Sequence, residues 1–316
     1  PKKETEATKE TDERSDALKA VMRDINKKLG ANSVKFASEE LSKDRIPTGI
    51  EALDKFIGGG IPRGNFSIVW GGMSAGKTSL ALYTIASAQK MGLTCAHLDL
   101  EHTFDSNRAT QFGVDVDKLV LITGTTNAEE AMDTTIMLAK NKVVDLIVVD
   151  SIQALSPKGD QETKTGELKS VEDDTMALLA RKMGKFLNMS KDAVYQANVA
   201  VLLIGQMRTG GLGGYCPSAT LTGGNAKDHY SMLTMFMKSG SKADAPVRKQ
   251  KVEYVDEEGK TRKKTETEIA GFNCVIRIDK HKLSGCAAQG KEIAIPYYFE
   301  TGFTTPGATD EETTEE

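Results

Sequence analysis

The stretch Gly71-Gly72-Met73-Ser74-Ala75-Gly76-Lys77-Thr78 decides the fold of this chain. It follows the apolar run Ile68-Val69-Trp70 and precedes Ser79-Leu80-Ala81-Leu82-Tyr83, whose pattern is typical of a helix. A strand, a glycine-rich turn and a helix in this order let successive backbone N–H groups surround phosphate oxygens, with the positive end of the helix behind them. The spacing G-x-x-x-x-G-K-T therefore predicts a nucleoside triphosphate site.

Each residue type in this loop has a chemical use. Gly71 and Gly76 supply backbone freedom that a Cβ would restrict. Lys77 can reach the outer phosphates, and the hydroxyl of Thr78 can ligate Mg²⁺. We expect the nucleotide to contact the whole loop and the residue after it: Gly71, Gly72, Met73, Ser74, Ala75, Gly76, Lys77, Thr78 and Ser79.

The composition describes a globular chain. Its 316 residues, 39% hydrophobic and 27% charged, suffice for one large α/β domain with appendages. The net charge of −4 means that nucleic-acid binding would need a local basic patch. The cysteines form no C-x-x-C pair, which argues against a zinc site and favours a reducing cytoplasmic location. No apolar run approaches the roughly 20 residues that span a bilayer, so we expect no membrane partner.

Strand-like and helix-like segments alternate after the loop. The strand-like runs are Phe66–Trp70, Thr94–Leu100, Lys118–Ile122, Asp145–Val149 and Val199–Ile204, and helical patterns lie near 78–91, 106–112, 128–141 and 173–190. This alternation predicts an α/β fold with a mostly parallel central sheet covered on both faces. Three later runs lack intervening helices and indicate an antiparallel extension: Met232–Met237, Phe272–Ile278 and Ile293–Phe299.

The flanking segments differ from the core. Residues 1–14 are highly charged and are expected to be disordered. Residues 15–35 contain an amphipathic helix, which either packs on its own core or docks on a neighbouring subunit. The core spans residues 36–305, and its charged segment 241–270 is predicted to form a hairpin. The hairpin could touch nucleic acid, but its interleaved acidic residues favour a solvent-exposed surface. Residues 306–316 are acidic and expected to be disordered.

Two predicted strands end in carboxylates. Asp150 ends an apolar strand at the edge of the sheet where ligands bind, so it can hold Mg²⁺ through water beside Thr78. The run Leu98-Asp99-Leu100-Glu101-His102 ends another strand. A carboxylate there can orient the attacking water as a general base, which suits Glu101, with Asp99 as the competitor.

A further predicted strand ends in the amide of Gln206, which can hydrogen-bond a γ-phosphate. The glycine-rich stretch that follows, through Asn225, is either an order–disorder switch for an extended ligand or merely a mobile loop. A second polar loop, 156–174, is expected on the same edge of the sheet. Arg181 and Arg208 near these loops would suit a phosphate backbone.

Near the end of the core, Lys280 and Lys282 occupy alternate positions and hence one face of an extended segment. They either lie at a solvated strand end or reach a γ-phosphate held by the adjacent subunit, as an arginine finger does in trans.

In this order the motifs resemble the RecA family of homologous-recombination ATPases, from about Leu18 to about Phe303. Many ATPases share the phosphate loop, whereas four other motifs in combination are specific: Glu101-His102, Gln206-Met207-Arg208, Thr222-Gly223-Gly224-Asn225-Ala226 and Lys280-His281-Lys282.

The resemblance implies a RecA-like ATPase core preceded by an oligomerisation helix. It implies a DNA-dependent ATPase that uses ATP and Mg²⁺, forms a helical filament on single-stranded DNA, pairs it with homologous double-stranded DNA and exchanges strands. Glu101 would then activate water, Gln206 would sense ATP, and Asp105 would lie near adenine. Lys280 and Lys282 would act across the filament interface. The implied DNA contacts are Met176, Arg181, Arg208, Gly223, Gly224 and Asn225.

The chain also departs from the family pattern. The family carries a C-terminal DNA-capturing domain, whereas this chain stops soon after Phe303, as in a truncated, phage-encoded member. The 241–270 hairpin or Lys238 would then capture duplex DNA. Asp228 reverses a charge at an interface position and affects the expected coupling between subunits. The alternative functions are a hexameric DNA helicase, which forms closed rings, and an ATP switch that regulates partners.

Overall fold

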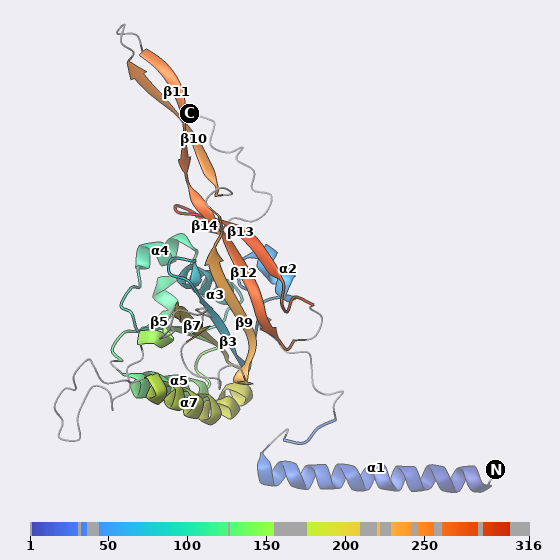
Figure 1. Ribbon diagram of the computed structural model, residues 1–316. Coiled ribbons are helices and arrows are strands. Elements are labelled where there is room, and N and C mark those ends of the chain that lie inside the picture. Colours follow the sequence, from blue (N-terminus) through green and yellow to red (C-terminus); the bar gives the residue numbers. More distant parts are fainter. Residues whose placement is uncertain are drawn as a thin grey trace, which may run out of the picture. The chain divides into compact units, whose positions relative to one another are not determined.

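The computed structural model describes residues 2–30, 33–36, 44–125, 127–154, 176–208, 220–221, 229–241, 245–255, 261–283 and 287–303. The chain divides into two units, Pro1–Lys43 and Asp44–Glu316 (Figure 1). Across the described ranges, no helix combines the length and the apolar character needed to cross a lipid bilayer.

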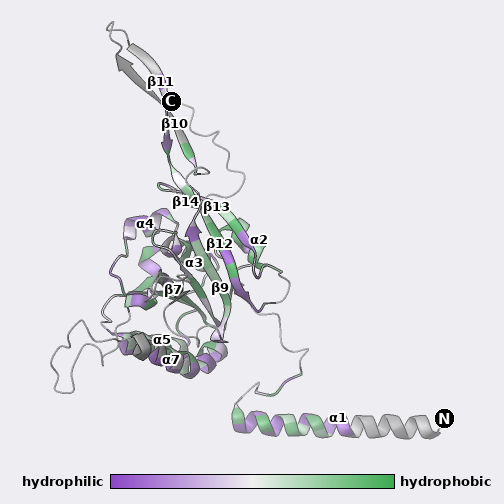
Figure 2. Cartoon of the chain, in the orientation of Figure 1, coloured by the Kyte–Doolittle hydropathy of each residue, from purple (hydrophilic) through white to green (hydrophobic). Residues whose placement is uncertain are grey.

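The first unit contains the long helix α1 (Lys2–Leu29) and a turn that follows it. Apolar residues recur along the carboxyl-terminal half of the helix (Figure 2), and Leu18 and Val21 are 49% and 54% exposed. The helix stops at Gly30, and the side chain of Asn26 then bonds both the N–H and the carbonyl of Val34, at 2.8 and 2.9 Å. This bond turns the chain back at the end of the helix.

Helix α1 begins at Lys2, so it includes most of the charged segment 1–14 as well as the amphipathic helix that the sequence predicted. The segment is too polar to build a core. Lys, Glu and Ala nevertheless have high helix propensity, so the segment continues the amphipathic helix outward.

The second unit is built on a large sheet with the strand order β14-β13-β12-β9-β3-β7-β6-β4-β5 (Figure 1). Its central strands pair in parallel, as predicted: β3 (Asn65–Gly71), β4 (Cys95–Asp99), β5 (Leu119–Ile122), β6 (Leu146–Asp150) and β7 (Ala200–Arg208). The antiparallel part comprises β12 (Gly271–His281), β13 (Glu292–Tyr298) and β14 (Gly302–Phe303), and β8 (Thr220–Leu221) pairs antiparallel with β7.

Strand β9 (Ser231–Ser239) differs from the expectation that the antiparallel extension begins near Met232. It pairs in parallel with β3 and antiparallel with β12. A parallel crossover needs about a dozen residues, which segment 209–230 provides without a helical sequence pattern. The antiparallel part therefore begins one strand later, at β12.

Helices cover both faces of the sheet. On one face, α2 (Glu51–Ile57), α3 (Lys77–Lys90) and α4 (Ser106–Gln111) contribute to a buried core with Val69 and Met235. On the other, α5 (Ala128–Lys140) and α7 (Met176–Ala197) form a second core with Ile68 and Trp70. Because neighbouring residues of a strand point to opposite faces, a strand buried on both faces is largely apolar, as β3 is over Ile68-Val69-Trp70.

Two smaller strand pairs complete the unit. Strands β1 (Arg45–Ile46) and β2 (Ile61–Pro62) pair antiparallel around α2. The charged segment in which the sequence predicted a hairpin forms β10 (Val247–Val255) and β11 (Thr261–Ile269), which pair antiparallel with each other.

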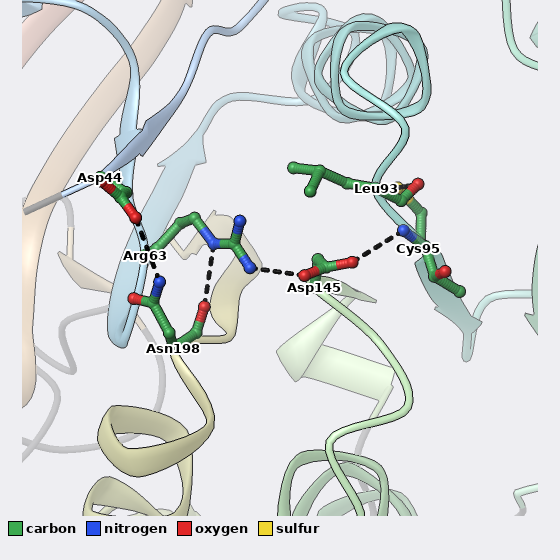
Figure 3. Close-up of polar contacts among 7 residues, drawn as sticks. Asp44, Arg63, Leu93, Cys95, Asp145 and Asn198 are labelled. Atoms are coloured by element: carbon green, nitrogen blue, oxygen red, sulfur yellow. Dashed lines mark hydrogen bonds and ion pairs between the residues drawn. The ribbon is translucent and has the colours of Figure 1, made fainter.

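A polar cluster joins the amino ends of the central strands (Figure 3). Arg63, just before β3, forms an ion pair with Asp145, just before β6, and donates to the carbonyl of Asn198 at 3.0 Å. Asp145 also accepts from the N–H of Thr94 at 2.9 Å. The Asn198 amide donates to Asp44 at 3.3 Å. One arginine therefore links the starts of three strands, opposite the edge where the phosphate loop lies.

Candidate functional site: a nucleotide pocket at the sheet edge

The phosphate loop lies between β3 and α3. At Gly71, which has a φ of +151°, an added Cβ would lie 1.8 Å from the carbonyl oxygen of Met237 on β9, so only glycine fits. Helix α3 begins at Lys77, after Gly76 with a φ of +89°, and no side chain caps it in the described part of the chain. Its first N–H groups therefore remain available to an anionic ligand.

A cavity of about 540 Å³ opens beside the loop. Groups from three strand ends meet there, since Glu101, Asp150 and Gln206 all line it. The remaining lining residues are the loop residues from Met73 to Ser79 and three aromatic residues, Phe272, Tyr297 and Phe299. The structure thus brings together side chains that are far apart in the sequence.

The aromatic wall was not foreseen in the sequence. Phe272 comes from β12, Tyr297 from β13 and Phe299 from just after it, and the rings of Phe272 and Tyr297 stack at 4.9 Å. Their strands were recognised, but only long-range antiparallel pairing returns them to the loop. Flat apolar rings beside a phosphate site suit a nucleobase.

Thr78 and Asp150 form the candidate Mg²⁺ position. The Thr78 hydroxyl donates to Asp150 at 2.7 Å, and Asp150 is only 3% exposed. Burial raises the pKa of Asp150 to about 6, and the nearby Glu101 and Asp99 add to the shift, whereas the Thr78 hydrogen bond and Lys77 oppose it. A buried carboxylate that lacks full solvation is stabilised by a cation, so this pair fits Mg²⁺.

Among the described residues, no group of three or more His, Cys, Asp or Glu side chains could hold a metal ion by itself. Mg²⁺ bound with a nucleotide takes one or two protein oxygens together with phosphate oxygens and water. Thr78 and Asp150 match that smaller set.

Lys77 lies inside the cavity as a largely desolvated ammonium. It is 8% exposed and donates to the carbonyl of Gly72 at 2.6 Å, across the loop. Burial lowers the pKa of Lys77, while Asp150 and Glu101 oppose the shift. A desolvated ammonium interacts more strongly with a phosphate than an exposed one does.

The structure gives different surroundings to Asp99 and Glu101, the two candidate carboxylates at the end of β4. Asp99 is 2% exposed and accepts from the N–H groups of Thr103 and Phe104, at 3.2 and 2.8 Å, so it shapes the following loop. Glu101 instead faces the cavity, where it accepts from the Gln206 amide at 2.8 Å and from the Ser151 hydroxyl. Of the two, Glu101 is the one that can contact a ligand.

Gln206 connects this carboxylate to the end of β7. Its side chain bonds Glu101, and its backbone carbonyl accepts from the Gln153 amide at 2.8 Å. Strand β7 ends two residues later at Arg208. A movement of the Glu101 carboxylate can therefore be transmitted through Gln206 to the segment that follows β7.

Asp105 caps helix α4 and is not among the residues that line the cavity. Its carboxylate accepts from the N–H groups of Asn107 and Arg108, at 2.8 and 3.3 Å. Arg108, which the sequence analysis did not single out, donates to the carbonyl of Phe299 at 2.8 Å and to the Tyr297 hydroxyl at 3.1 Å. Arg108 thus fastens α4 to the aromatic wall.

The lysine pair lies far from the cavity of its own subunit. Phe272, near the start of β12, lines the cavity, and Lys280 follows it by eight residues on the same strand. At about 3.3 Å per residue, this separation is roughly 26 Å. The Lys280 ammonium lies 3.5 Å from the Ser231 hydroxyl at the start of β9, and neither Lys280 nor Lys282 lines that cavity.

The described residues include part of the predicted DNA surface. Helix α7 starts at Met176 and carries Arg181, which is exposed, and β7 ends at Arg208. Gly223, Gly224, Asn225 and Asp228 lie outside the described residues, as do the whole polar loop at 156–174 and the acidic tail.

Comparison with known proteins now assigns the chain to a family. The model of the RecA N-terminal domain matches residues 16–287, which include the phosphate loop, Glu101, Asp150, Gln206 and the lysine pair. The chain belongs to the RecA family. Tyr297 and Phe299 of the aromatic wall lie beyond the part that matches this RecA domain.

Individual RecA proteins are similar over most of this chain. It is 38% identical to Protein RecA of Nitratidesulfovibrio vulgaris over 70% of this chain and 61% of the relative. It is 39% identical to Protein RecA of Nautilia profundicola over 69% of this chain and 62% of the relative. With Protein RecA of Chloroflexus aurantiacus it shares 36% identity over 71% of this chain and 63% of the relative. The chain thus spans less than two thirds of the length of these relatives.

Proposed function

We propose that this RecA-family protein is an ATP-dependent DNA recombinase. It assembles into a helical filament on single-stranded DNA in the cytoplasm, pairs that strand with homologous double-stranded DNA, and exchanges the strands while it hydrolyses ATP. The observation that carries this proposal is the Gln206–Glu101 hydrogen bond, because it joins the nucleotide cavity to the strand end that leads into the candidate DNA loop.

The nucleotide is held by the loop and by α3. Backbone N–H groups of the loop and the ammonium of Lys77 bind the phosphates, and the aromatic wall packs on the base. Thr78 and Asp150 hold Mg²⁺, which supplies positive charge to the phosphate oxygens. The family resemblance would place Asp105 near adenine, although its carboxylate is committed to capping α4.

Hydrolysis uses Glu101 as the general base. A water molecule attacks the γ-phosphorus, its proton passes to the Glu101 carboxylate, and the bond between the γ-phosphorus and the β,γ-bridging oxygen breaks to release ADP and phosphate. Ser151 orients the carboxylate through its hydrogen bond.

Nucleotide binding is coupled to DNA binding through Gln206. A γ-phosphate oxygen competes for the Gln206 amide and draws it from Glu101, which shifts the end of β7. The proposed DNA contacts then assemble around that end: Met176, Arg181, Arg208, Gly223, Gly224 and Asn225. Hydrolysis removes the competing oxygen and releases the loops.

Assembly completes the site. Helix α1 exposes apolar residues such as Leu18 and Val21, which dock on the next subunit as an oligomerisation helix. Lys280 and Lys282, which do not line the cavity of their own subunit, supply positive charge to the γ-phosphate of a neighbour.

Electron microscopy tests the proposal directly. The full chain is mixed with single-stranded DNA and a non-hydrolysable ATP analogue, and the control omits the nucleotide. We expect helical filaments on DNA only when the analogue is present. Closed rings would instead identify a helicase-like assembly, and failure to assemble would identify an ATP switch that acts without a filament.

A further inference from the structure

Strand β12 contains a β-bulge directly before the lysine pair. Ile278 pairs with Met235 of β9 and Lys280 pairs with the adjacent Thr234, so Asp279 is an extra residue without a partner on β9. A bulge shifts the alternation of side chains by one position and re-aims those that follow it.

The burial pattern records this shift. Before the bulge, Cys274, Ile276 and Ile278 are buried, and after it His281 and Leu283 are buried. Uninterrupted alternation would continue from Ile278 to bury residues 280 and 282. The extra residue therefore takes both lysines off the buried face.

Asp279 is held in place from two strands. Its carboxylate accepts from the indole N–H of Trp70 on β3 at 2.8 Å and from the guanidinium of Arg277 at 2.7 Å. The Arg277 guanidinium in turn lies 4.7 Å from the ring centroid of Phe236 on β9, and Phe236 packs against Trp70 at 4.6 Å. The four side chains form a closed cluster across β3, β9 and β12, which we call the bulge clamp.

The segment after the bulge is fastened on its other face. The His281 ring lies 2.9 Å from the carbonyl of Ile57 at the end of α2, and the His281 N–H donates to the side chain of Gln289 at 3.2 Å. The Lys282 N–H donates to the carbonyl of Met232 at 2.9 Å. With the bulge clamped on one side and His281 anchored on the other, the lysine pair has a defined direction.

We propose that Asp279, held by Trp70 and Arg277, is a positioning residue that sets the direction of Lys280 and Lys282 for a phosphate bound by the adjacent subunit. This inference rests on the proposed action of the lysines across the filament interface. Asp279 itself is not among the residues that line the nucleotide cavity. It acts through the strand geometry, and its loss lets the bulge shift along β12.

Two variants test the bulge clamp without touching the cavity. Asp279→Ala removes the acceptor, and Trp70→Phe removes only the indole donor while it keeps an aromatic ring against Phe236. Glu292→Ala is the matched control, because it removes a comparable ion pair, Glu292–Lys238 at 3.4 Å, from the neighbouring strand β13. Lys280→Ala is the reference for loss of the lysine itself. Thermal unfolding verifies that each variant is folded.

The readouts are nucleotide affinity of dispersed protomers and ATP turnover on single-stranded DNA. We expect Asp279→Ala to lower turnover by about tenfold or more, and Trp70→Phe to lower it in the same direction, because small misplacements cost large factors in rate. Both variants keep the nucleotide affinity, and Glu292→Ala keeps both properties. Asp279→Ala combined with Lys280→Ala/Lys282→Ala loses no more than Lys280→Ala/Lys282→Ala does, since Asp279 acts through the two lysines.

The outcomes separate the two claims. If Lys280→Ala lowers turnover and the two clamp variants do not, the positioning role is wrong. It is also wrong if Asp279→Ala lowers the turnover of the Lys280→Ala/Lys282→Ala variant by the same factor as it does that of the wild type. If Lys280→Ala itself leaves turnover unchanged, the proposed action of the lysines is wrong and the positioning role falls with it.

Discussion

At the scale of single residues, the end of β4 carries two carboxylates, Asp99 and Glu101, that are two residues apart and have different roles. Asp99 accepts two backbone N–H groups of the loop that follows it, whereas Glu101 faces the cavity with Gln206 and Ser151. The sequence favoured Glu101 and left Asp99 as a competitor, because both follow the same apolar run. The choice depends on the path of the backbone after Asp99.

The variant Glu101→Gln tests this division. It keeps the size of the side chain and removes the proton acceptor, so ATP binding should persist while turnover falls by at least about 100-fold. Phosphate release measures turnover, and fluorescence titration with a nucleotide analogue measures binding. Turnover equal to that of the wild type would assign the general base to another residue.

The buried carboxylate of Asp150 should destabilise the folded protein, although the proposed Mg²⁺ site requires it. Its pKa in the folded protein, about 6, lies above the ordinary 3.8, so protons bind the folded state more tightly and the ionised carboxylate destabilises it. Without ligand at pH 7.5, Asp150→Asn should raise the free energy of unfolding by up to about 3 kcal/mol. The gain should shrink as the pH falls through 6 toward 4.

Denaturant titrations across this pH range measure the effect, and Mg²⁺-dependent ATP hydrolysis should be lost in the same variant. A variant that is less stable than the wild type at pH 7.5 would contradict the assignment of a destabilising buried carboxylate at this position.

His97 has the opposite pH dependence. It is 1% exposed, and neither ring nitrogen has a hydrogen-bond partner among the described residues. Burial lowers the pKa of His97 to about 4, below the ordinary 6.5, although Asp99 opposes the shift. Protons therefore bind the unfolded state more tightly, and His97 should cost about 2 kcal/mol of stability between pH 7 and pH 5.

The variant His97→Leu removes the titrating group and keeps an apolar side chain in the core. We expect its unfolding free energy to fall less than that of the wild type when the pH is lowered from 7 to 5. Equal losses in both proteins would show that His97 does not contribute to acid destabilisation.

At the scale of helices and strands, the local patterns predicted most of the core. The phosphate loop, the parallel strands and the helices between them follow from periodicity and from one motif whose chemistry dictates its spacing. The parallel pairing of β9, the aromatic wall and the bulge at Asp279 were not predictable in this way. Each arises from pairing between segments far apart in the sequence.

The polar cluster at the amino ends of the strands provides a test at this scale (Figure 3). Arg63→Met keeps the aliphatic stem and removes the ion pair with Asp145 and the bond to Asn198. Because this pair is partly buried, we expect a loss of about 1–3 kcal/mol in the free energy of unfolding. Lys118→Met is the control, since its pair with Asp115 is exposed. The free energy of unfolding of Lys118→Met should equal that of the wild type. Equal losses in Arg63→Met and Lys118→Met would show that the polar cluster stabilises the fold no more than an exposed ion pair does.

At the scale of the whole molecule, the nucleotide cavity contains the phosphate loop, the Mg²⁺ pair and the candidate base, but not the lysine pair. Sequence resemblance implied that these lysines act between subunits. The structure supports that view, because neither lysine lines the cavity of its own subunit and Lys280 contacts Ser231 at the start of β9. In the proposed function, the working unit is therefore two adjacent subunits.

Mixing two inactive variants tests this central claim most directly. Glu101→Gln lacks the base but keeps the lysines, and the double variant Lys280→Ala/Lys282→Ala keeps the base but lacks the lysines. In mixed filaments on single-stranded DNA, an interface works when an intact base meets intact lysines from the neighbour.

The measurement is ATP turnover of an equal mixture, compared with each variant alone. Random order would make roughly one quarter of the interfaces competent, so the account predicts recovery of about a quarter of the wild-type rate. A mixture that forms filaments but hydrolyses ATP no faster than the two variants do separately would contradict it.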